Sequence, residues 1–149
     1  MVVGLVGWRI CLGGAGLKRW SLFAIWLILV GGVIVCADRG VLRGFFRWIN
    51  GIPFGDKAGH VFLIGIMAHL LNCAMAGRTS GIGRSRWQMG GLIVAVVMTI
   101  EEISQIWIPS RTFDLGDLAA NYVGILLAEW RARCATARRS ATIDSGAES

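Results

Sequence analysis

The sequence is short of charge. Charged residues make up only 16% of its 149 positions, whereas hydrophobic residues reach 55% and the mean hydropathy is +0.63. Soluble domains carry about a quarter charged residues, so this deficit predicts that lipid replaces water around most of the chain. The length corresponds to one domain and excludes a large soluble enzyme joined to a membrane anchor.

Motifs that would mark a known chemistry are also missing. The chain has no H-E-x-x-H motif, no G-x-S-x-G motif and no C-x-x-C pair. Its cysteines are scattered, which predicts packing residues and not a disulfide or zinc framework. The net charge of +6 is compatible with nucleic acid, but the chain lacks a soluble basic and aromatic module, so we expect no nucleic-acid partner. The cysteines are Cys11, Cys36, Cys73 and Cys134.

Four stretches are apolar enough to test as membrane spans, which need about 17 to 25 residues. Segments 20–37, 58–76 and 87–108 reach this length, although the third contains two glutamates and a glutamine. Segment 118–130 is short for a full crossing and is followed by a basic tail. The sequence therefore predicts an all-α, polytopic membrane bundle of about four transmembrane helices over residues 20–130.

Residues 1–19 and 131–149 flank this predicted domain. The first segment reads as a cytoplasmic or interfacial lead-in, because Arg9 interrupts its apolar run and no cleavage site follows. The second reads as a basic and then disordered cytoplasmic tail. If the N-terminus is inside, ten basic residues lie on the cytoplasmic side and five on the outer side. The positive-inside rule thus predicts that both termini are cytoplasmic.

Unusual polarity converges on the predicted outer end of the bundle. Glu102 lies about 9 Å below the end of the third span, at 1.5 Å per residue. A charge at that depth normally faces a cavity or a polar partner, because lipid exposure is costly. The other candidate site residues at this end are Asp56, Lys57, His60, Gln105, Arg111, Asp114, Asp117 and Asn121.

Helical spacing predicts that these residues share faces. Either Glu101 or Glu102 can lie one turn before Gln105, but the two glutamates point about 100° apart, so only one is expected to face the site. Three helices are therefore expected to present a polar stripe to the same end. The other two stripes are Asp56 with His60, and Asp114 with Asp117 and Asn121.

Ordinary structural roles explain part of this polarity. Asp114 suits the N-cap of the fourth span, with Asp117 favourably placed against the helix dipole, and Asp56 could cap the second span. Lys57 could simply extend its ammonium to the membrane surface. Capping leaves four residues unexplained, which are Glu101, Glu102, Gln105 and Asn121.

Arg111 is the cation between the acidic third span and the two aspartates that follow it. Its guanidinium could pair with a carboxylate and hold the loop against the bundle. It could equally bind the carboxylate or phosphate of a ligand. The sequence leaves both roles open.

In order and spacing, these residues resemble the VanZ-like family of small bacterial membrane proteins. The pattern is D-K-x-x-H from Asp56, E-x-x-Q from Glu102, and R-x-x-D-x-x-D-x-x-x-N-x-x-G from Arg111 to Gly124. The resemblance covers residues 20–130 and implies a helical bundle in the bacterial cytoplasmic membrane, with Glu102 turned inward. The family is named after a member linked to teicoplanin resistance, which makes glycopeptide tolerance a role to test. The chain departs from the family at Val61, Phe62, Leu63 and Ile64, where aromatic residues are common.

Two classes of function fit these residues. In the first, an envelope protein uses an outer-face polar pocket to bind a polar or anionic ligand, such as a lipid-linked wall precursor or a lipid headgroup. In the second, a membrane-embedded enzyme acts on such a headgroup, with His60 and Glu102 as candidate acid and base. Acidic groups beside His60 could alternatively hold Mg²⁺ or Zn²⁺.

A purely structural network is a third reading, in which the polar residues fix the helix register. Hydrogen bonds inside membranes average only about 0.6 kcal/mol, which is little stabilisation for burying carboxylates. A proton relay or small transporter fits less well, because four short spans enclose little room. Membrane lipid is the expected partner, and the sequence identifies neither a cofactor nor an oligomeric state.

Overall fold

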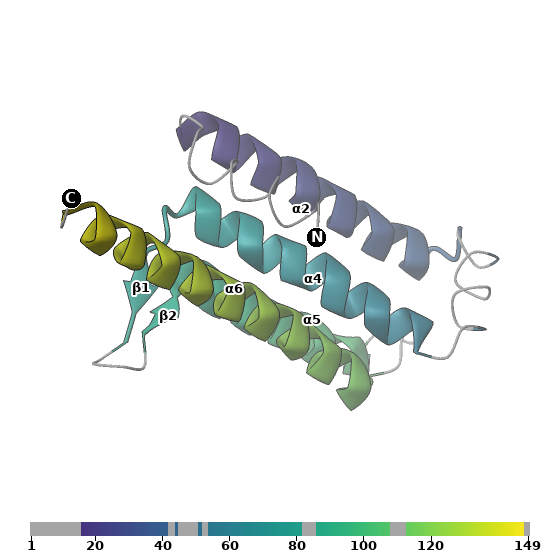
Figure 1. Ribbon diagram of the computed structural model, residues 1–149. Helices are drawn as coiled ribbons and strands as arrows, with labels where there is room; N and C mark the ends of the chain where they lie inside the picture. Colours follow the sequence, from purple (N-terminus) through teal and green to yellow (C-terminus); the bar gives the residue numbers. More distant parts are fainter. Residues whose placement is uncertain are drawn as a thin grey trace.

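The computed structural model describes residues 16–41, 44, 51, 54–81, 86–107 and 113–147, with the backbone alone at 37, 38 and 136–147. Four long helices make up most of this part of the chain (Figure 1). They are α2 (Gly16–Asp38), α4 (Gly55–Ala74), α5 (Met89–Ser104) and α6 (Leu115–Ala147), and α5 continues into the short 3₁₀ helix η1 (Gln105–Trp107).

Three segments are long and apolar enough to cross a membrane, namely Gly16–Cys36, Gly55–Ala74 and Met89–Trp107. They match the first three predicted spans to within a few residues, which confirms the expectation of several transmembrane helices. The first span begins inside the expected lead-in, because Gly16 already lies in α2. The chain is therefore built as a multi-pass membrane protein.

A small β-hairpin is the one departure from an all-α fold in the described residues. Strand β1 (Thr79–Ser80) pairs antiparallel with β2 (Trp87–Gln88). Gly77 and Gly81 both have positive φ, which lets the chain turn sharply after α4. Because Trp87 and Gln88 belong to β2, α5 begins two residues later than the expected third span.

Helix α6 does not stop at residue 130, the expected end of the fourth span. It continues to Ala147, through the segment expected to be a basic and disordered tail. Residues 131–141 are rich in Ala and Arg and contain neither Gly nor Pro, so their intrinsic helix propensity is high. By length and hydropathy alone, α6 is not among the helices that could cross a membrane.

The helices alternate in direction, and α4 is central. α6 lies along α4 in the same direction, α5 runs antiparallel to both, and α2 packs on another side of α4 (Figure 1). We call the end where α4 and α6 begin and α5 finishes the acidic end. The opposite end, where β1 and β2 lie, is the hairpin end.

The core lies between α4, α5 and α6, and it fixes how α4 and α6 meet. A Cβ added at Gly124 would lie 2.5 Å from the Val61 carbonyl oxygen and 2.9 Å from the Gly65 nitrogen. Only glycine permits this approach, so the contact sets the register of the two helices. The buried residues of this core cluster are Ile64, Met67, Ala68, Leu71, Val94, Met98, Ile125 and Ala128.

The expectation that all four cysteines are packing residues was wrong for one of them. Cys36 and Cys134 carry free thiols, whereas Cys73 is disulfide-bonded. Cys11 lies outside the described residues. Sequence spacing misses such a bond because it says nothing about which cysteines the fold brings together.

Candidate functional site

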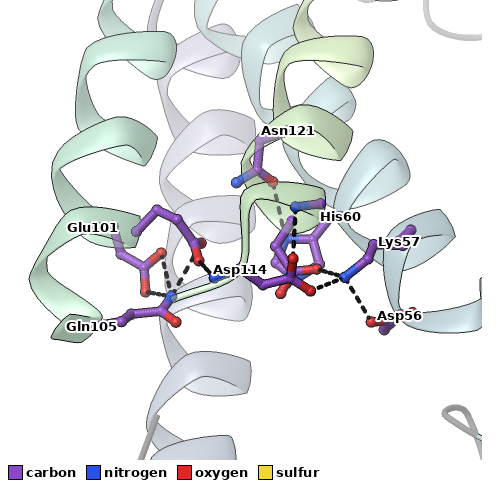
Figure 2. A network of polar contacts seen from close by, with 10 residues as sticks. Asp56, Lys57, His60, Glu101, Gln105, Asp114 and Asn121 are labelled. Atoms are coloured by element: carbon purple, nitrogen blue, oxygen red, sulfur yellow. Dashed lines mark hydrogen bonds and ion pairs between the residues drawn. The ribbon is translucent and has the colours of Figure 1, made fainter. Parts of the chain in front are cut away.

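The ammonium group of Lys57 is the centre of the polar network at the acidic end. Its Nζ lies 2.5 Å from Asp114 Oδ2, 2.5 Å from Asp117 Oδ1 and 3.2 Å from Asp56 Oδ2 (Figure 2). The first turn of α4 is thereby tied to the first turn of α6. Lys57 therefore does more than extend into the headgroup region, since carboxylates from two helices bind its charge.

Asp114 caps α6, as its position in the sequence predicts. Its Oδ1 accepts a hydrogen bond from the Gly116 N–H at 2.7 Å, and its carbonyl oxygen accepts from the Asp117 N–H at 3.0 Å. The hydrogen bond from Lys57, followed by that from Gly116, holds the pKa of the Asp114 carboxyl below its ordinary value. A Cβ on Gly116 would lie 2.8 Å from Lys57 Cε, so glycine makes room for the lysine.

Asp56 does not cap α4, so the capping prediction for this residue was wrong. The N-cap position is Phe54, which has φ 60° and no side-chain capping hydrogen bond. Asp56 lies one residue inside the helix, where its carboxylate is turned to Lys57. A carboxylate in the first turn still interacts favourably with the helix dipole.

His60 and Asn121 meet one turn deeper in the bundle. His60 Nδ1 lies 3.0 Å from Asn121 Oδ1, and its Nε2 lies 3.7 Å from Asp117 Oδ2. Asn121 is 1% exposed, and its Nδ2 has no hydrogen-bond partner. In Figure 2 this nitrogen points away from His60. Within the described part of the chain, it is the one buried side-chain nitrogen or oxygen without a partner.

Glu102 is fully buried and joins α5 to the start of α6. Its Oε1 accepts a hydrogen bond from the Asp114 N–H at 3.1 Å, and its Oε2 accepts from Gln105 Nε2 at 3.2 Å. The prediction that Glu102 is the inward carboxylate is confirmed. Glu101 is less deeply buried and reaches the same Gln105 amide at 3.3 Å.

The sequence-predicted residues thus come together from three helices, and the cluster is strongly acidic. Its described part holds five carboxylates and one ammonium, a formal charge of −4. Arg111 lies outside the described residues. No group of three or more His, Cys, Asp or Glu side chains in the described part could hold a metal ion. We call this set the acidic cluster, and it consists of Asp56, Lys57, His60, Glu101, Glu102, Gln105, Asp114, Asp117 and Asn121.

A second buried polar cluster lies at the hairpin end, and the sequence analysis missed it. Asn72 Nδ2 donates to Glu129 Oε1 at 3.0 Å. Glu129 Oε2 accepts from the Gln88 N–H at 3.1 Å, and Asn72 Oδ1 accepts from the Gly91 N–H at 2.8 Å. Asn72 and Glu129 therefore satisfy backbone donors at the start of α5.

The sequence did contain a signal for this second cluster. Asn72 and Glu129 both lie inside predicted spans, at 58–76 and 118–130. The argument that singled out Glu102 applies equally to them, because buried polar groups in a membrane need partners. The sequence analysis passed over them because neither belongs to the set of polar residues that converges on the opposite end of the bundle.

Comparison with known proteins adds no assignment, since no family model, no curated protein and no solved structure matches the chain. The resemblance to the VanZ-like family stays a prediction that rests on residues 56 to 124.

Proposed function

We propose that the protein is a VanZ-like, four-span protein of the bacterial cytoplasmic membrane. The fourth span is α6, whose polar residues are the reason for its low hydropathy. Two of these, Asn121 and Glu129, are 1% and 3% exposed, so lipid does not meet them. The exposed face of α6 carries apolar and aromatic residues suited to lipid, namely Tyr122, Val123, Leu126, Leu127 and Trp130.

The distribution of cations supports an outer location for the acidic end. Of the basic residues whose side chains the structure describes, two lie at that end, Arg39 and Lys57. Six lie at the hairpin end, where α2 also begins (Figure 1). Cytoplasmic ends carry the excess of Lys and Arg. The six are Lys18, Arg19, Arg78, Arg86, Arg131 and Arg133.

The function that the geometry supports best is binding of a polar envelope headgroup by the acidic cluster. The observation that carries this proposal is the unpartnered Nδ2 of Asn121. A buried donor without an acceptor costs about 1–3 kcal/mol, so an oxygen brought by a ligand would remove this cost. Lipid-linked wall precursors and phospholipids both supply such oxygens as hydroxyl, carbonyl or phosphate groups.

The charge of the acidic cluster limits which chemical groups the ligand can carry. Asp56 and Asp114 have side chains that are 44% and 49% exposed, so they can accept hydrogen bonds from hydroxyl or ammonium groups. Lys57 is already bound by three carboxylates, so its charge is less available to an anionic ligand. A headgroup with both donors and acceptors, such as a sugar or a phosphoethanolamine, complements the described residues better than a simple anion.

Native mass spectrometry of the purified protein in detergent tests this proposal. The probes are a polyprenyl-linked disaccharide wall precursor, phosphatidylethanolamine and phosphatidylglycerol, each titrated against wild type and Asn121→Leu. We expect wild type to retain the precursor or phosphatidylethanolamine, and Asn121→Leu to bind it at least about fivefold more weakly, the equivalent of one hydrogen bond.

Tyr122→Phe is the matched control, because it alters the adjacent residue on the same helix. The Tyr122 hydroxyl contacts Thr99 Oγ1 at 2.9 Å and takes no part in the acidic cluster. This variant should bind as wild type does. Equal binding by wild type and Asn121→Leu, or no binding of any probe, would sink the proposal.

A second candidate function is acid–base chemistry on the same headgroup, and the position of His60 favours it. Its imidazole is held at Nδ1 by Asn121 and lies near the Asp117 carboxylate at Nε2. A histidine held in this orientation can act as a general acid or base toward a bound headgroup. If this candidate holds, His60→Gln retains headgroup binding but loses product formation in an assay of the wild-type protein with the bound lipid.

The family resemblance extends the proposal to glycopeptide tolerance. Expression in a sensitive bacterium, with Asn121→Leu as the comparison, would show whether tolerance of teicoplanin depends on the acidic cluster. Equal sensitivity with and without the protein would remove this part of the proposal.

A further inference from the structure

At the hairpin end, the guanidinium of Arg133 is held in a fixed orientation. Its Cζ lies 5.1 Å from the centroid of the Trp87 ring, and its Nη2 donates to the Arg86 carbonyl oxygen at 3.1 Å. Stacking on an indole and donation to a carbonyl restrain two directions at once. An exposed arginine is rarely fixed in this way without further contacts.

Two hydrogen bonds hold the hairpin against α5 and α6. The Met89 N–H donates to the Arg78 carbonyl oxygen at 2.8 Å, so the first strand is joined to the start of α5. The Gln88 N–H donates to the buried Glu129 carboxylate. These contacts fix the backbone at Arg78 and Arg86, and the side chain of Arg133 on α6 is bound to the same hairpin; all three residues are exposed.

No carboxylate of the described residues pairs with these three cations. Glu129 is the nearest candidate by sequence, but it is 3% exposed and binds Asn72 and the Gln88 N–H. The hairpin therefore presents positive charge that a partner can neutralise.

Neighbouring aromatic residues mark the depth of this charge. Trp87 lies two residues before Met89, the first residue of the apolar helix α5, and Trp130 on α6 is 65% exposed. Tryptophan is enriched at the level of lipid headgroups. We therefore expect the three guanidinium groups to lie at the level of the lipid phosphates.

We propose that Arg78, Arg86 and Arg133 form a binding site for the phosphate of an anionic phospholipid headgroup. Guanidinium groups bind phosphate oxygens through paired hydrogen bonds, and the fixed Arg133 supplies such a pair without further ordering. The lipid acyl chains would lie against the exposed apolar faces of α5 and α6. This site is separate from the acidic cluster and does not depend on the proposed function.

The test uses the full-length protein in nanodiscs of phosphatidylcholine alone or mixed with phosphatidylglycerol. Thermal unfolding is followed in both, and phosphatidylglycerol retention is measured by native mass spectrometry. We expect phosphatidylglycerol to raise the melting temperature of wild type. Arg86→Gln and Arg133→Gln should each weaken its apparent affinity about fivefold, the effect of one cation near an anionic surface.

Two further variants separate a built site from general attraction. Arg133→Lys keeps the charge but loses the planar guanidinium with its paired N–H donors, and we expect it to lose most of the phosphatidylglycerol effect. Arg39→Gln removes one cation from the other end of the bundle, and it should behave as wild type. Inorganic phosphate added to phosphatidylcholine nanodiscs should give no shift, because the site is completed by a lipid anchored in the bilayer.

Three outcomes would contradict the proposal of a lipid phosphate site. If Arg133→Lys kept the full rise in melting temperature with phosphatidylglycerol, the lipid would be attracted only by the overall positive charge and not bound at a specific site. Equal losses of stability in both kinds of nanodisc would make Arg133 a structural residue only. If inorganic phosphate raised the melting temperature as much as phosphatidylglycerol does, the site would be one for a free anion and not for a lipid headgroup.

Discussion

The two ends of the bundle bury polar groups in different ways. At the hairpin end, both oxygens of Glu129 and both polar atoms of Asn72 have partners, two of them backbone N–H groups of the chain entering α5. At the acidic end, Asn121 keeps a buried nitrogen without a partner, and Asp114 remains about half exposed. The first network is saturated and the second is not.

This difference separates two roles that look alike in sequence. A saturated buried network stabilises the fold, because every group that loses water gains a hydrogen bond. A network with an unused donor and exposed carboxylates has capacity left for a ligand. Mutations at the hairpin end should therefore act mainly on stability, and mutations at the acidic end mainly on binding.

The largest expected effect is that of Glu129→Ala. Asn72 Nδ2 and the Gln88 N–H would both lose their acceptor, and each buried orphan costs about 1–3 kcal/mol. We expect the free energy of unfolding in detergent to fall by about 3 kcal/mol. Glu129→Gln keeps an acceptor oxygen and should lose clearly less. If the alanine variant were nearly as stable as wild type, the inference that the hairpin-end network stabilises the fold would be wrong.

Gly90→Ala should be the next most damaging change. The added Cβ would lie 2.4 Å from Asn72 Oδ1 and 2.6 Å from the Asn72 nitrogen, so the backbone of α4 must shift. Overpacking of this kind costs about 1–3 kcal/mol in thermal or chemical unfolding. Gly59→Ala in α4 is the matched control, because nothing lies within 4 Å of the added atom. If both variants unfold alike, the helices are less closely packed than the geometry requires.

Asn121→Leu should change stability far less than Glu129→Ala, although both residues are buried. It removes one contact with His60, worth about 1 kcal/mol, but it also removes an unpaired donor. We expect a net change below about 1 kcal/mol in the same unfolding assay. A loss as large as that of Glu129→Ala would show that the acidic end is also a structural network.

The smallest effect concerns Asp114, and it depends on pH. Its folded-state pKa lies below the ordinary value of 3.8, so its contribution to stability is present above that pH. The contribution is lost as pH falls through the lower, folded-state pKa. Asp114→Asn retains a good capping residue without the charge. Its melting temperature should be lower than that of wild type near neutral pH, and the two should converge in acid. A constant difference at every pH would exclude the Lys57 interaction as the cause.

Local patterns in the sequence predicted most of the helices and most members of the acidic cluster. Hydropathy located three spans, and helical spacing brought His60, Glu102 and Asn121 to the same end. The capping role of Asp114 followed from its position before an apolar helix. The same reasoning wrongly assigned a cap to Asp56, because α4 begins at Gly55 with Phe54 at the N-cap position and the Asp56 carboxylate contacts Lys57 instead.

Sequence by itself determined which apolar segments are helical and which end of each carries polarity, because both depend on residues only one or two turns apart. Tertiary structure alone decided which polar atoms find partners. That outcome depends on the close approach of α4 and α6 at Gly65 and Gly124, which sets Asn121 beside His60. Hydrogen bonds require atoms to meet within about 3 Å, so a small shift between helices decides whether a buried group is satisfied or left available to a ligand.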